Sequence, residues 1–381
     1  MRSFDPNRRQ ILAAGIAAVA ALPAATGAYS AAVQSPASQG TKMRAYQIGP
    51  QQDLNSLALV ARDPLRAGPG EVVVEVRASA LNHRDLSILR GLYGPRKPFD
   101  RIPVGDGAGV VREVGEGVPS FKVGDRVTAP HFVLWQDGVY EPNVFSADTG
   151  NSKNGWLADE IALPASALLR LPDAISFEEA AALGAAGITA WHVVKTLGQA
   201  KASDTVLALG TGGVSILALQ IAKLNGARVA ITSSSDDKLD VCRELGADIT
   251  VNYRKQPAWQ NAIRAATNGR GVDIVVETVG ITTLAQSLAC CAPNARVGLL
   301  GALGGPASGT TQLGALILNN IVLKGITSGS KRMLDELLRA STDHGLQPKI
   351  DRVFPFLAAA EAFAYLDSAA HIGKIVIRHE A

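Results

Sequence analysis

The chain has 381 residues, of which 47% are hydrophobic and 19% charged, and a formal net charge of +3. The length suggests two domains of about 100–200 residues each, and the apolar content is too high for a disordered chain. The small net charge and the lack of a Lys/Arg run argue against nucleic-acid binding. The three cysteines form no CxxC pair, so we expect no disulfide framework and place Cys290 and Cys291 on a packed helix.

The first 28 residues have the order of an export signal. Arg8 and Arg9 precede an apolar, Ala-rich stretch that ends near Leu22, and small residues follow. The arginine pair is typical of the twin-arginine route, and the apolar stretch is too short for an ordinary transmembrane span. We expect residues 1–28 to be such a signal, which leaves a periplasmic or secreted mature protein without a stable membrane span, and residues 29–42 to be a linker. An uncleaved anchor, a disordered tail, or a non-functional signal on a cytoplasmic protein are the alternatives.

Short strands dominate the next part of the chain. Residues 71–78 alternate between apolar and polar side chains, residues 107–115 are another strand between glycines, and residues 121–127 are a turn followed by a strand. Strands at this spacing predict a small barrel. Residues 131–155 form a long polar loop without a readable motif, so the sequence does not identify the substrate.

From residue 176 the pattern changes to alternating strands and helices. Ser176 and Glu179 form a capping box ahead of an Ala-rich helix that we expect to reach Leu197. The predicted strands are 205–209, 228–231, 249–251, 272–277, 296–300 and 321–326, separated by the predicted helices 213–225, 236–245, 258–267, 284–291 and 313–318. This alternation predicts a doubly wound parallel sheet. After Ser330 come two helices and the segments 352–356 and 373–377.

These patterns predict an α/β protein in which a β-rich unit is interrupted by a nucleotide-binding unit. We assign residues 43–175 together with 330–381 to the β-rich domain and residues 176–329 to the parallel-sheet domain. A cleft between two such domains is where a substrate would meet a coenzyme.

A glycine-rich turn joins the predicted strand 205–209 to the helix that follows. Its residues are Gly210, Thr211, Gly212, Gly213 and Val214. Glycines let the backbone turn tightly and approach phosphates, and the helix N-terminus offers free N–H groups. The context therefore predicts a dinucleotide site rather than a plain tight turn, although Ser215 stands near the usual place of a third glycine.

The end of the second predicted strand of this domain indicates the coenzyme. An NAD enzyme carries a carboxylate there to bind the ribose 2′-hydroxyl. This chain has Ser233 and Ser234, with Lys238 shortly after them, and such groups would accept a 2′-phosphate. We favour NADP(H) over NAD(H). Asp236 and Asp237 argue against this unless they serve as first-turn residues of the helix, and the serines could be a simple N-cap run.

Eight motifs, in order, resemble those of the medium-chain dehydrogenase/reductase superfamily and cover nearly everything after residue 43. They lie at residues 68–72, 80–85, 107–111, 123–127, 187–191, 210–214, 269–273 and 373–377. The resemblance implies a GroES-like catalytic domain, split in sequence, around a Rossmann domain that binds NAD(P). It also implies coenzyme contacts for Thr189, Tyr253 and Gly301, and a homodimer that pairs through the strand near residues 321–324.

The zinc ligands of the superfamily's alcohol dehydrogenases are absent. Where those enzymes carry Cys, His and a further Cys, this chain has Asn82, Gly105 and a residue near Gly184. We therefore expect no zinc, and only cleft polarity from His83 and His131. Residues 82–85 and 105–107 resemble instead the Asn-Tyr-Arg-Asp and Ser-Asp-Gly motifs of the zinc-independent quinone oxidoreductase and alcohol dehydrogenase-like branch.

That branch transfers hydride from NADPH to a quinone, an enone or a related carbonyl compound. Without a metal, hydrogen-bond donors must stabilise the charge on the substrate oxygen, and Asn82 is the nearest candidate by motif. Asp85 would orient Asn82 or a neighbouring amide, unless it only caps the local turn. Thr189 would contact the nicotinamide, unless it bonds only to its own helix. Tyr93 would donate a proton or line the pocket, unless it only packs in its turn.

Two other functions stay open. One is a metal-free NAD(P)-dependent alcohol or aldehyde dehydrogenase, which would also act on a small molecule. The other is an NADPH-binding protein with little turnover, acting as a redox sensor or a structural protein, because the sequence shows no clear proton donor.

Overall fold

The computed structural model describes residues 42–94, 100–301 and 314–380. The predicted export signal and nearly all of the predicted linker lie outside these residues. Within the described part of the chain, no helix is both long and apolar enough to cross a membrane.

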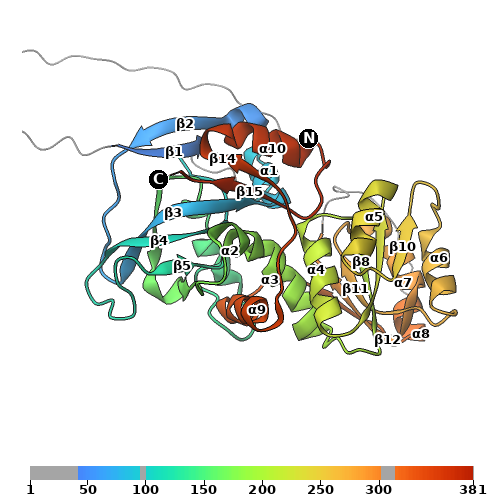
Figure 1. Ribbon diagram of the computed structural model, residues 1–381. Helices are drawn as coiled ribbons and strands as arrows, with labels where there is room; N and C mark the ends of the chain where they lie inside the picture. Colours follow the sequence, from blue (N-terminus) through green and yellow to red (C-terminus); the bar gives the residue numbers. More distant parts are fainter. Residues whose placement is uncertain (1–41, 95–99, 302–313, 381) are drawn as a thin grey trace, which may run out of the picture. The chain divides into compact units, whose positions relative to one another are not determined.

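One sheet has seven strands and combines segments from both ends of the chain (Figure 1). Its order is β14-β15-β3-β4-β5-β7, with β6 also paired to β3. The bounds are β3 Glu71–Leu81, β4 Asp106–Val114, β5 Arg126–Thr128, β6 Glu160–Pro164, β7 Leu169–Arg170, β14 Ile350–Pro355 and β15 Lys374–Arg378. β15 pairs antiparallel with β3, so that Ile375 faces Leu81. This register places Lys374 beside the end of β3. Strands β1 (Met43–Ile48) and β2 (Leu57–Arg62) form a separate antiparallel pair.

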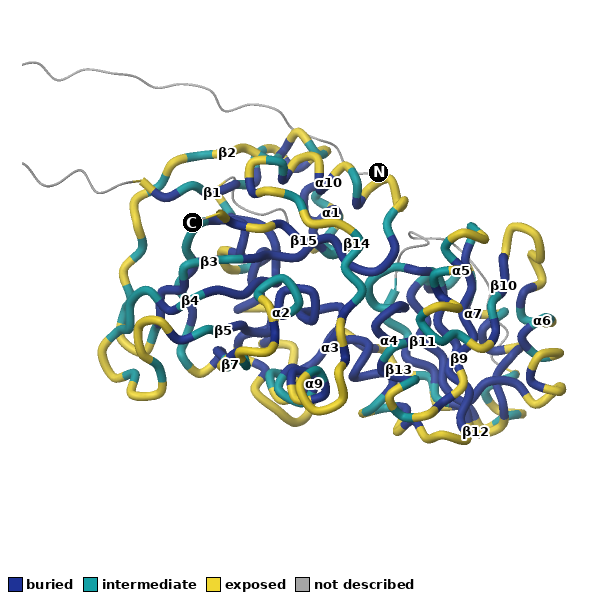
Figure 2. Tube along the Cα trace, viewed as in Figure 1, coloured by how far each residue is buried: buried dark blue, intermediate teal, exposed yellow. Residues whose placement is uncertain are grey.

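The second sheet contains the six predicted parallel strands, in the order β10-β9-β8-β11-β12-β13. Their bounds are β8 Thr205–Leu209, β9 Arg228–Ser233, β10 Ile249–Asn252, β11 Val272–Glu277, β12 Cys291–Leu299 and β13 Val322–Gly325. β8 and β11 are buried along their whole length, as expected for central strands of a parallel sheet (Figure 2). The fold is therefore α/β, with the doubly wound sheet that the sequence predicted.

The structure describes ten α-helices. They are α1 His83–Leu89, α2 Phe177–Leu183, α3 Ala185–Trp191, α4 Gly213–Leu224, α5 Asp236–Glu244, α6 Trp259–Ala266, α7 Ile281–Ala289, α8 Gly314–Leu318, α9 Lys331–His344 and α10 Ala359–Asp367. Alternate residues of β8 belong to different cores: Val206 and Ala208 to one, Leu207 and Leu209 to the other. Both faces of the parallel sheet are thus covered.

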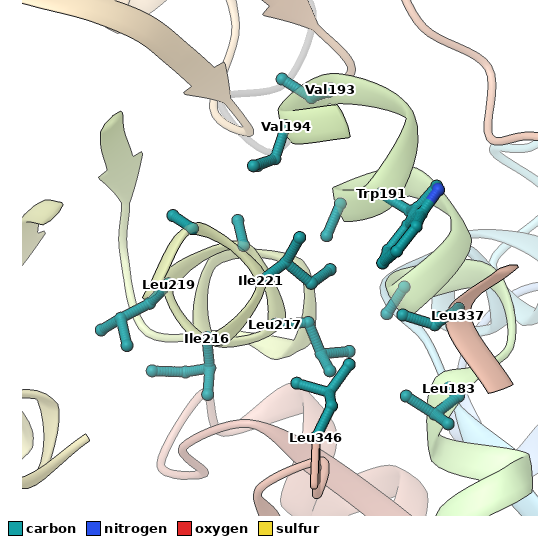
Figure 3. Close-up of a cluster of buried hydrophobic side chains, with 14 of the residues drawn as sticks. Leu183, Trp191, Val193, Val194, Ile216, Leu217, Leu219, Ile221, Leu337 and Leu346 are labelled. Atoms are coloured by element: carbon teal, nitrogen blue, oxygen red, sulfur yellow. The ribbon is translucent and has the colours of Figure 1, made fainter. Parts of the chain in front are cut away.

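The helix α4 is packed tightly at the core that it shares with α3. Figure 3 shows Leu217 and Ile221 of α4 on the side of Trp191 and Leu337, whereas Ile216, in the same buried cluster, points to the other side of the helix. Burial of several large apolar side chains, each contributing about 1.5–3 kcal/mol, holds α4 firmly. Its N-terminus, which follows the glycine-rich turn, is therefore on a rigid support.

The predicted helix from Ser176 to Leu197 is not continuous, and this prediction was wrong. The capping box is present, but α2 ends at Leu183 and α3 starts at Ala185, with a break at Gly184 (φ −47°, ψ −129°). Residues His192–Leu197 then continue as a π-helix. The break has a physical cause, because the amide of Ala185 donates to the buried carboxylate of Asp106 at 2.9 Å instead of bonding within a helix.

The expected place of two cysteines on a helix was also wrong. Cys290 follows the end of α7 as its C-cap, and Cys291 is the first residue of β12. Both are free thiols and fully buried, as is Cys242. Burial raises the pKa of Cys242 to about 11 and that of Cys291 to about 12, so these thiols are unreactive packing residues.

Candidate active site and coenzyme site

The glycine-rich turn between β8 and α4 has the shape of a phosphate site. Gly210 adopts a left-handed conformation (φ +74°). Gly212 is the N-cap of α4, so no side chain of the cap residue occupies the N–H groups of the first helical turn. A Cβ atom at Gly210 or Gly212 would meet nothing within 4 Å, so the space beside both residues is open. Free N–H groups at a helix N-terminus next to open space suit a pyrophosphate. These residues fit a dinucleotide coenzyme.

Ser215 has a structural explanation at the usual place of a third glycine. Its hydroxyl donates to the carbonyl oxygen of Leu209 at 2.6 Å and thereby ties the first turn of α4 to the end of β8. Thr211 is buried beside it, and Val214 is half-buried against the core. Ser215 therefore stabilises the turn, although it departs from the usual glycine pattern.

Ser233 and Tyr253 lie together at the ends of neighbouring strands. The Tyr253 amide donates to the carbonyl oxygen of Ser233 at 3.0 Å, and the Tyr253 side chain is 41% exposed. Ser234 follows directly, and Ser235 caps α5. The strand β9 ends without a carboxylate. Asp236, the first acidic residue after it, is paired with Lys255.

Lys238 is directed elsewhere. Its ammonium group donates to the carbonyl oxygens of Ala369 at 2.7 Å and His371 at 2.9 Å. The ammonium group of Lys238 therefore holds the segment before β15, while the backbone N–H of Lys238 donates to Oγ of Ser235, the cap of α5, at 3.4 Å.

Thr189 and Gly301 serve the backbone in this structure. The Thr189 hydroxyl donates to the carbonyl oxygen of Ala185 at 2.6 Å. This bond lies within its own helix, which was the alternative to a nicotinamide contact. It also lies 3.4 Å from the hydroxyl of Ser328. A Cβ atom at Gly301 would overlap the carbonyl oxygen of Thr278, so the close approach of two chain segments requires glycine.

Sequence reasoning missed Ser328. This residue is buried and has φ 145°, a conformation that L-residues rarely adopt. Its carbonyl oxygen is 2.6 Å from Nδ1 of His192, which fixes the segment after β13. Ser328 therefore lies beside Thr189 in a strained backbone conformation, and no motif in the sequence marked it.

Asn82 is the centre of a buried polar network. Its Nδ2 donates to Oδ2 of Asp106 at 2.7 Å, and its Oδ1 accepts from Nζ of Lys374 at 2.7 Å. Asp106 also accepts the Ala185 amide, and Lys374 also donates to the carbonyl oxygen of Leu81 at 2.7 Å. Three segments far apart in the sequence therefore fix one amide.

Asp85 caps the backbone next to Asn82. Its Oδ2 accepts a hydrogen bond from the backbone N–H of Asn82 at 2.8 Å. This bond is compatible with both expected roles of Asp85, to orient Asn82 and to cap the local turn. The carboxyl is fully buried, and burial raises the pKa of Asp85 to about 6. Oδ1 of Asp85 and Oδ1 of Asp106 are both buried and have no hydrogen-bond partner among the described residues.

Tyr93 is brought to a buried charged cluster that the sequence did not predict. The guanidinium carbon of Arg84 lies 5.4 Å from the centre of the Tyr93 ring. Arg84 pairs with Asp148 at 2.9 Å, and Nδ1 of His131 lies 2.8 Å from the same carboxylate oxygen. Burial raises the pKa of Tyr93, so its phenol keeps its proton at neutral pH.

The residues at the expected metal positions do not fit a catalytic zinc ion. A Cβ atom at Gly184 would lie 2.6 Å from Oδ1 of Asp106, so the carboxylate occupies the space of a side chain there. A Cβ atom at Gly105 would lie 3.3 Å from Nη1 of Arg84. Asn82 is already bonded on both sides. Within residues 42–94, 100–301 and 314–380, no group of three or more His, Cys, Asp or Glu side chains could hold a metal.

Two surface hollows, one beside Ile175 and Leu346 and one beside Glu178 and Ile350, contain none of the candidate residues. The candidate site is thus defined by the buried network and by the glycine-rich turn. These two parts are linked directly, because the Gly373 amide donates to the carbonyl oxygen of Thr211 at 3.0 Å.

A coenzyme turn on a Rossmann sheet next to a β-rich domain defines an NAD(P)-dependent oxidoreductase of the alcohol dehydrogenase type. Comparisons with known proteins agree. Residues 213–343 match a family model described as zinc-binding dehydrogenase, and residues 68–173 match the alcohol dehydrogenase GroES-like domain.

Whole-chain relatives show the family. A zinc-type alcohol dehydrogenase-like protein of Schizosaccharomyces pombe is 39% identical over 83% of this chain and 92% of its own length. The quinone oxidoreductase of Pseudomonas aeruginosa is 30% identical over 82% of this chain and 93% of its length. The crystal structure of an NAD-dependent alcohol dehydrogenase superposes with a TM-score of 0.80 at 34% identity, and the match covers 88% of this chain and 99% of that one. The chain belongs to the medium-chain dehydrogenase/reductase superfamily.

Proposed function

We propose that the protein is a zinc-independent, NADPH-dependent oxidoreductase that transfers hydride to a quinone, an enone or a related carbonyl compound. The observation that supports this proposal is the hydrogen-bonded Asn82–Asp106–Lys374 network. By motif, Asn82 stands at a position where the zinc enzymes of the superfamily carry a cysteine ligand. The residues 43–175 with 330–381 would form the catalytic domain and residues 176–329 the coenzyme domain.

The bound coenzyme would supply the hydride, and the protein must stabilise the charge that develops on the acceptor oxygen. Asn82 has one amide hydrogen left after its bond to Asp106, and it can donate this hydrogen to that oxygen. Arg84 stays charged, because Asp148 and the other groups around it raise the pKa of the guanidinium above its usual range although burial works against the charge. Its charge is balanced by Asp148, 2.9 Å away. Tyr93 is the candidate proton donor, since its phenol is neutral.

The coenzyme preference for NADPH is supported by the end of β9. Ser233, Ser234 and Tyr253 offer hydroxyl groups there, and the first carboxylate after the strand, Asp236, is paired with Lys255. A 2′-phosphate would therefore meet no free negative charge from these residues.

A metal-free NAD(P)-dependent alcohol dehydrogenase is the second candidate, and the relative described as an NAD-dependent alcohol dehydrogenase favours it. The test is anaerobic oxidation of NADPH and NADH by the full-length protein with a panel of quinones, enals and ketones, and reduction of NAD(P) with alcohols. Turnover of quinones or enals with NADPH supports the proposal. Turnover of alcohols alone favours the second candidate, and tight NADPH binding without any turnover indicates the sensor or structural protein.

We further propose export by residues 1–28 and assembly as a homodimer through β13. The twin arginines support export, and replacing Arg8 and Arg9 by Lys should keep the protein in the cytoplasm upon cell fractionation. The exposed side chains of Ile317, Leu318 and Val322 near the sheet edge support the dimer.

A further inference from the structure

We propose that Lys374 is a positioning residue that fixes and polarises the Asn82 amide for the acceptor oxygen. This inference rests on the proposed function, because it concerns how Asn82 acts in hydride transfer. It adds Lys374 to the site, whereas the sequence motif had placed this residue only in a strand.

The geometry places a buried ammonium directly on the amide. Lys374 is 2% exposed, and its Nζ lies 2.7 Å from Oδ1 of Asn82 and 2.7 Å from the carbonyl oxygen of Leu81. Burial lowers the pKa of Lys374, while Asp106 and Asp85 nearby favour its charged form. A cation in this position is costly unless its hydrogen bonds are made, and here two of the three are.

The two neighbours of Asn82 leave its side chain one orientation. An ammonium group only donates hydrogen bonds, and a carboxylate only accepts them. The amide oxygen must therefore face Lys374, and the NH₂ group must face Asp106, although the two ends of an amide are alike in shape. Asp106 alone already disfavours the flipped amide, because the amide oxygen would then face the carboxylate. Lys374 holds the oxygen side of the amide and so fixes the same orientation from the other end.

The contact between Lys374 and Oδ1 also makes the side-chain N–H of Asn82 a stronger hydrogen-bond donor. A positive charge at Oδ1 draws electron density from the amide, and in a buried site such polarisation is little screened. The remaining N–H of Asn82 then becomes a better partner for a developing negative charge. Lys374 thus acts through Asn82 and does not need to touch the substrate.

Lys374 also lies against the coenzyme turn, which the test must take into account. A Cβ atom at Gly213 would be 2.7 Å from Cδ of Lys374, and Gly212 forms a β-bridge with Gly373. The dissociation constant of NADPH is therefore measured separately, by quenching of tryptophan fluorescence, for every variant.

The first experiment is a double-mutant cycle on the full-length protein, using whichever acceptor in the panel is turned over fastest. We expect Asn82→Ala and Lys374→Met each to lower kcat by about 10–100-fold at saturating NADPH. The double variant should fall no more than about threefold below Asn82→Ala, because Lys374 has nothing left to orient. A double variant whose loss equals the product of the two single losses would overturn the proposal. Lys331→Met, which removes an exposed ammonium from the carbonyl oxygen of Ser166, controls for the loss of a lysine and should leave kcat within about twofold.

The second experiment does not depend on turnover. Selective ¹⁵N labelling of asparagine shows the side-chain NH₂ groups by NMR, and the Asn82 signal is the one lost in Asn82→Ala. We expect this signal to lie apart from those of exposed asparagines and its hydrogens to exchange slowly, and Lys374→Met should abolish both features while the remaining signals stay. An Asn82 signal that Lys374→Met does not change would refute the proposal. If no acceptor is turned over, the proposed function fails, and this second experiment still decides the role of Lys374.

Discussion

Asn82, Asp85 and Tyr93 could be proposed from the sequence because they lie in or near one short motif. What the sequence could not give is how they are held. Lys374 and Asp148 are 292 and 66 positions away from Asn82 along the chain. They reach the site only through the pairing of β15 with β3 and through the loop after β5. Their roles depend on tertiary contacts, which a local motif does not encode.

Asp85 gives the first prediction, a change in how stability depends on pH. With a pKa of about 6 when folded and 3.8 as its ordinary value, Asp85 binds its proton more tightly in the folded state. Its contribution to stability is therefore lost as the pH rises from about 4 to about 6. A pKa difference of about 2 corresponds to about 3 kcal/mol.

The variant Asp85→Asn cannot ionise. The free energy of unfolding of the variant, minus that of the wild type, should thus increase by up to about 3 kcal/mol between pH 4 and pH 7. Urea unfolding at a series of pH values measures this difference. A difference that stays constant across the range would show that Asp85 titrates normally.

Lys238 gives the second prediction, which concerns the choice of coenzyme. Lys238→Glu should raise the dissociation constant of NADPH at least about tenfold more than that of NADH, because a carboxylate would repel a 2′-phosphate. Since Lys238 also holds Ala369 and His371, loss of that contact alone would weaken both coenzymes equally. Lys238→Met serves as the control for this structural effect, and equal weakening in Lys238→Glu counts against the assignment.

The helices show where pattern reasoning succeeds and where it stops. The capping box of Ser176 and Glu179 fixed the start of α2 correctly. An Ala-rich run then continues through Gly184, so nothing in the local pattern signals the break there. The break exists because Asp106, from β4, takes the Ala185 amide. A helix end that is set by a residue 79 positions away is invisible to periodicity.

Gly184 gives the third prediction. In Gly184→Ala the new methyl group would lie 2.6 Å from Oδ1 of Asp106 and would displace a carboxylate that holds both Ala185 and Asn82. We expect a loss of about 1–3 kcal/mol in the free energy of unfolding, together with a lower kcat. Gly314→Ala, on the exposed face of α8 where a methyl group meets nothing within 4 Å, is the matched control and should not destabilise. Thermal unfolding at equal protein concentration measures both variants, and equal melting temperatures would contradict the expected clash.

The whole chain was predictable in its architecture because β/α alternation is a strong signal. All six strands of the parallel sheet appear where the sequence placed them, with ends shifted by a few residues at most except at β12, which starts at Cys291 rather than near residue 296. The joining of β14 and β15 to the first sheet matches the expected return of the C-terminal tail.

Assembly gives the fourth prediction. β13 is the edge of the parallel sheet, and the side chain of Val322 on it is 51% exposed. An exposed apolar edge strand pairs readily with another chain. Sedimentation equilibrium should give a dimer for the wild type and a monomer for Val322→Lys, because two lysines would meet across the interface. A monomeric wild type, or a variant that stays dimeric, would refute pairing through this edge.

Metal content tests the central claim most directly. The purified protein is analysed for zinc and assayed with NADPH and its best acceptor, before and after dialysis against a chelator. Because we propose that hydride transfer here needs no metal, and because Asn82 is bonded to Asp106 and Lys374, we expect far less than one zinc per chain and a kcat that dialysis does not change. Stoichiometric zinc together with loss of activity on chelation, restored by zinc alone, would contradict the account.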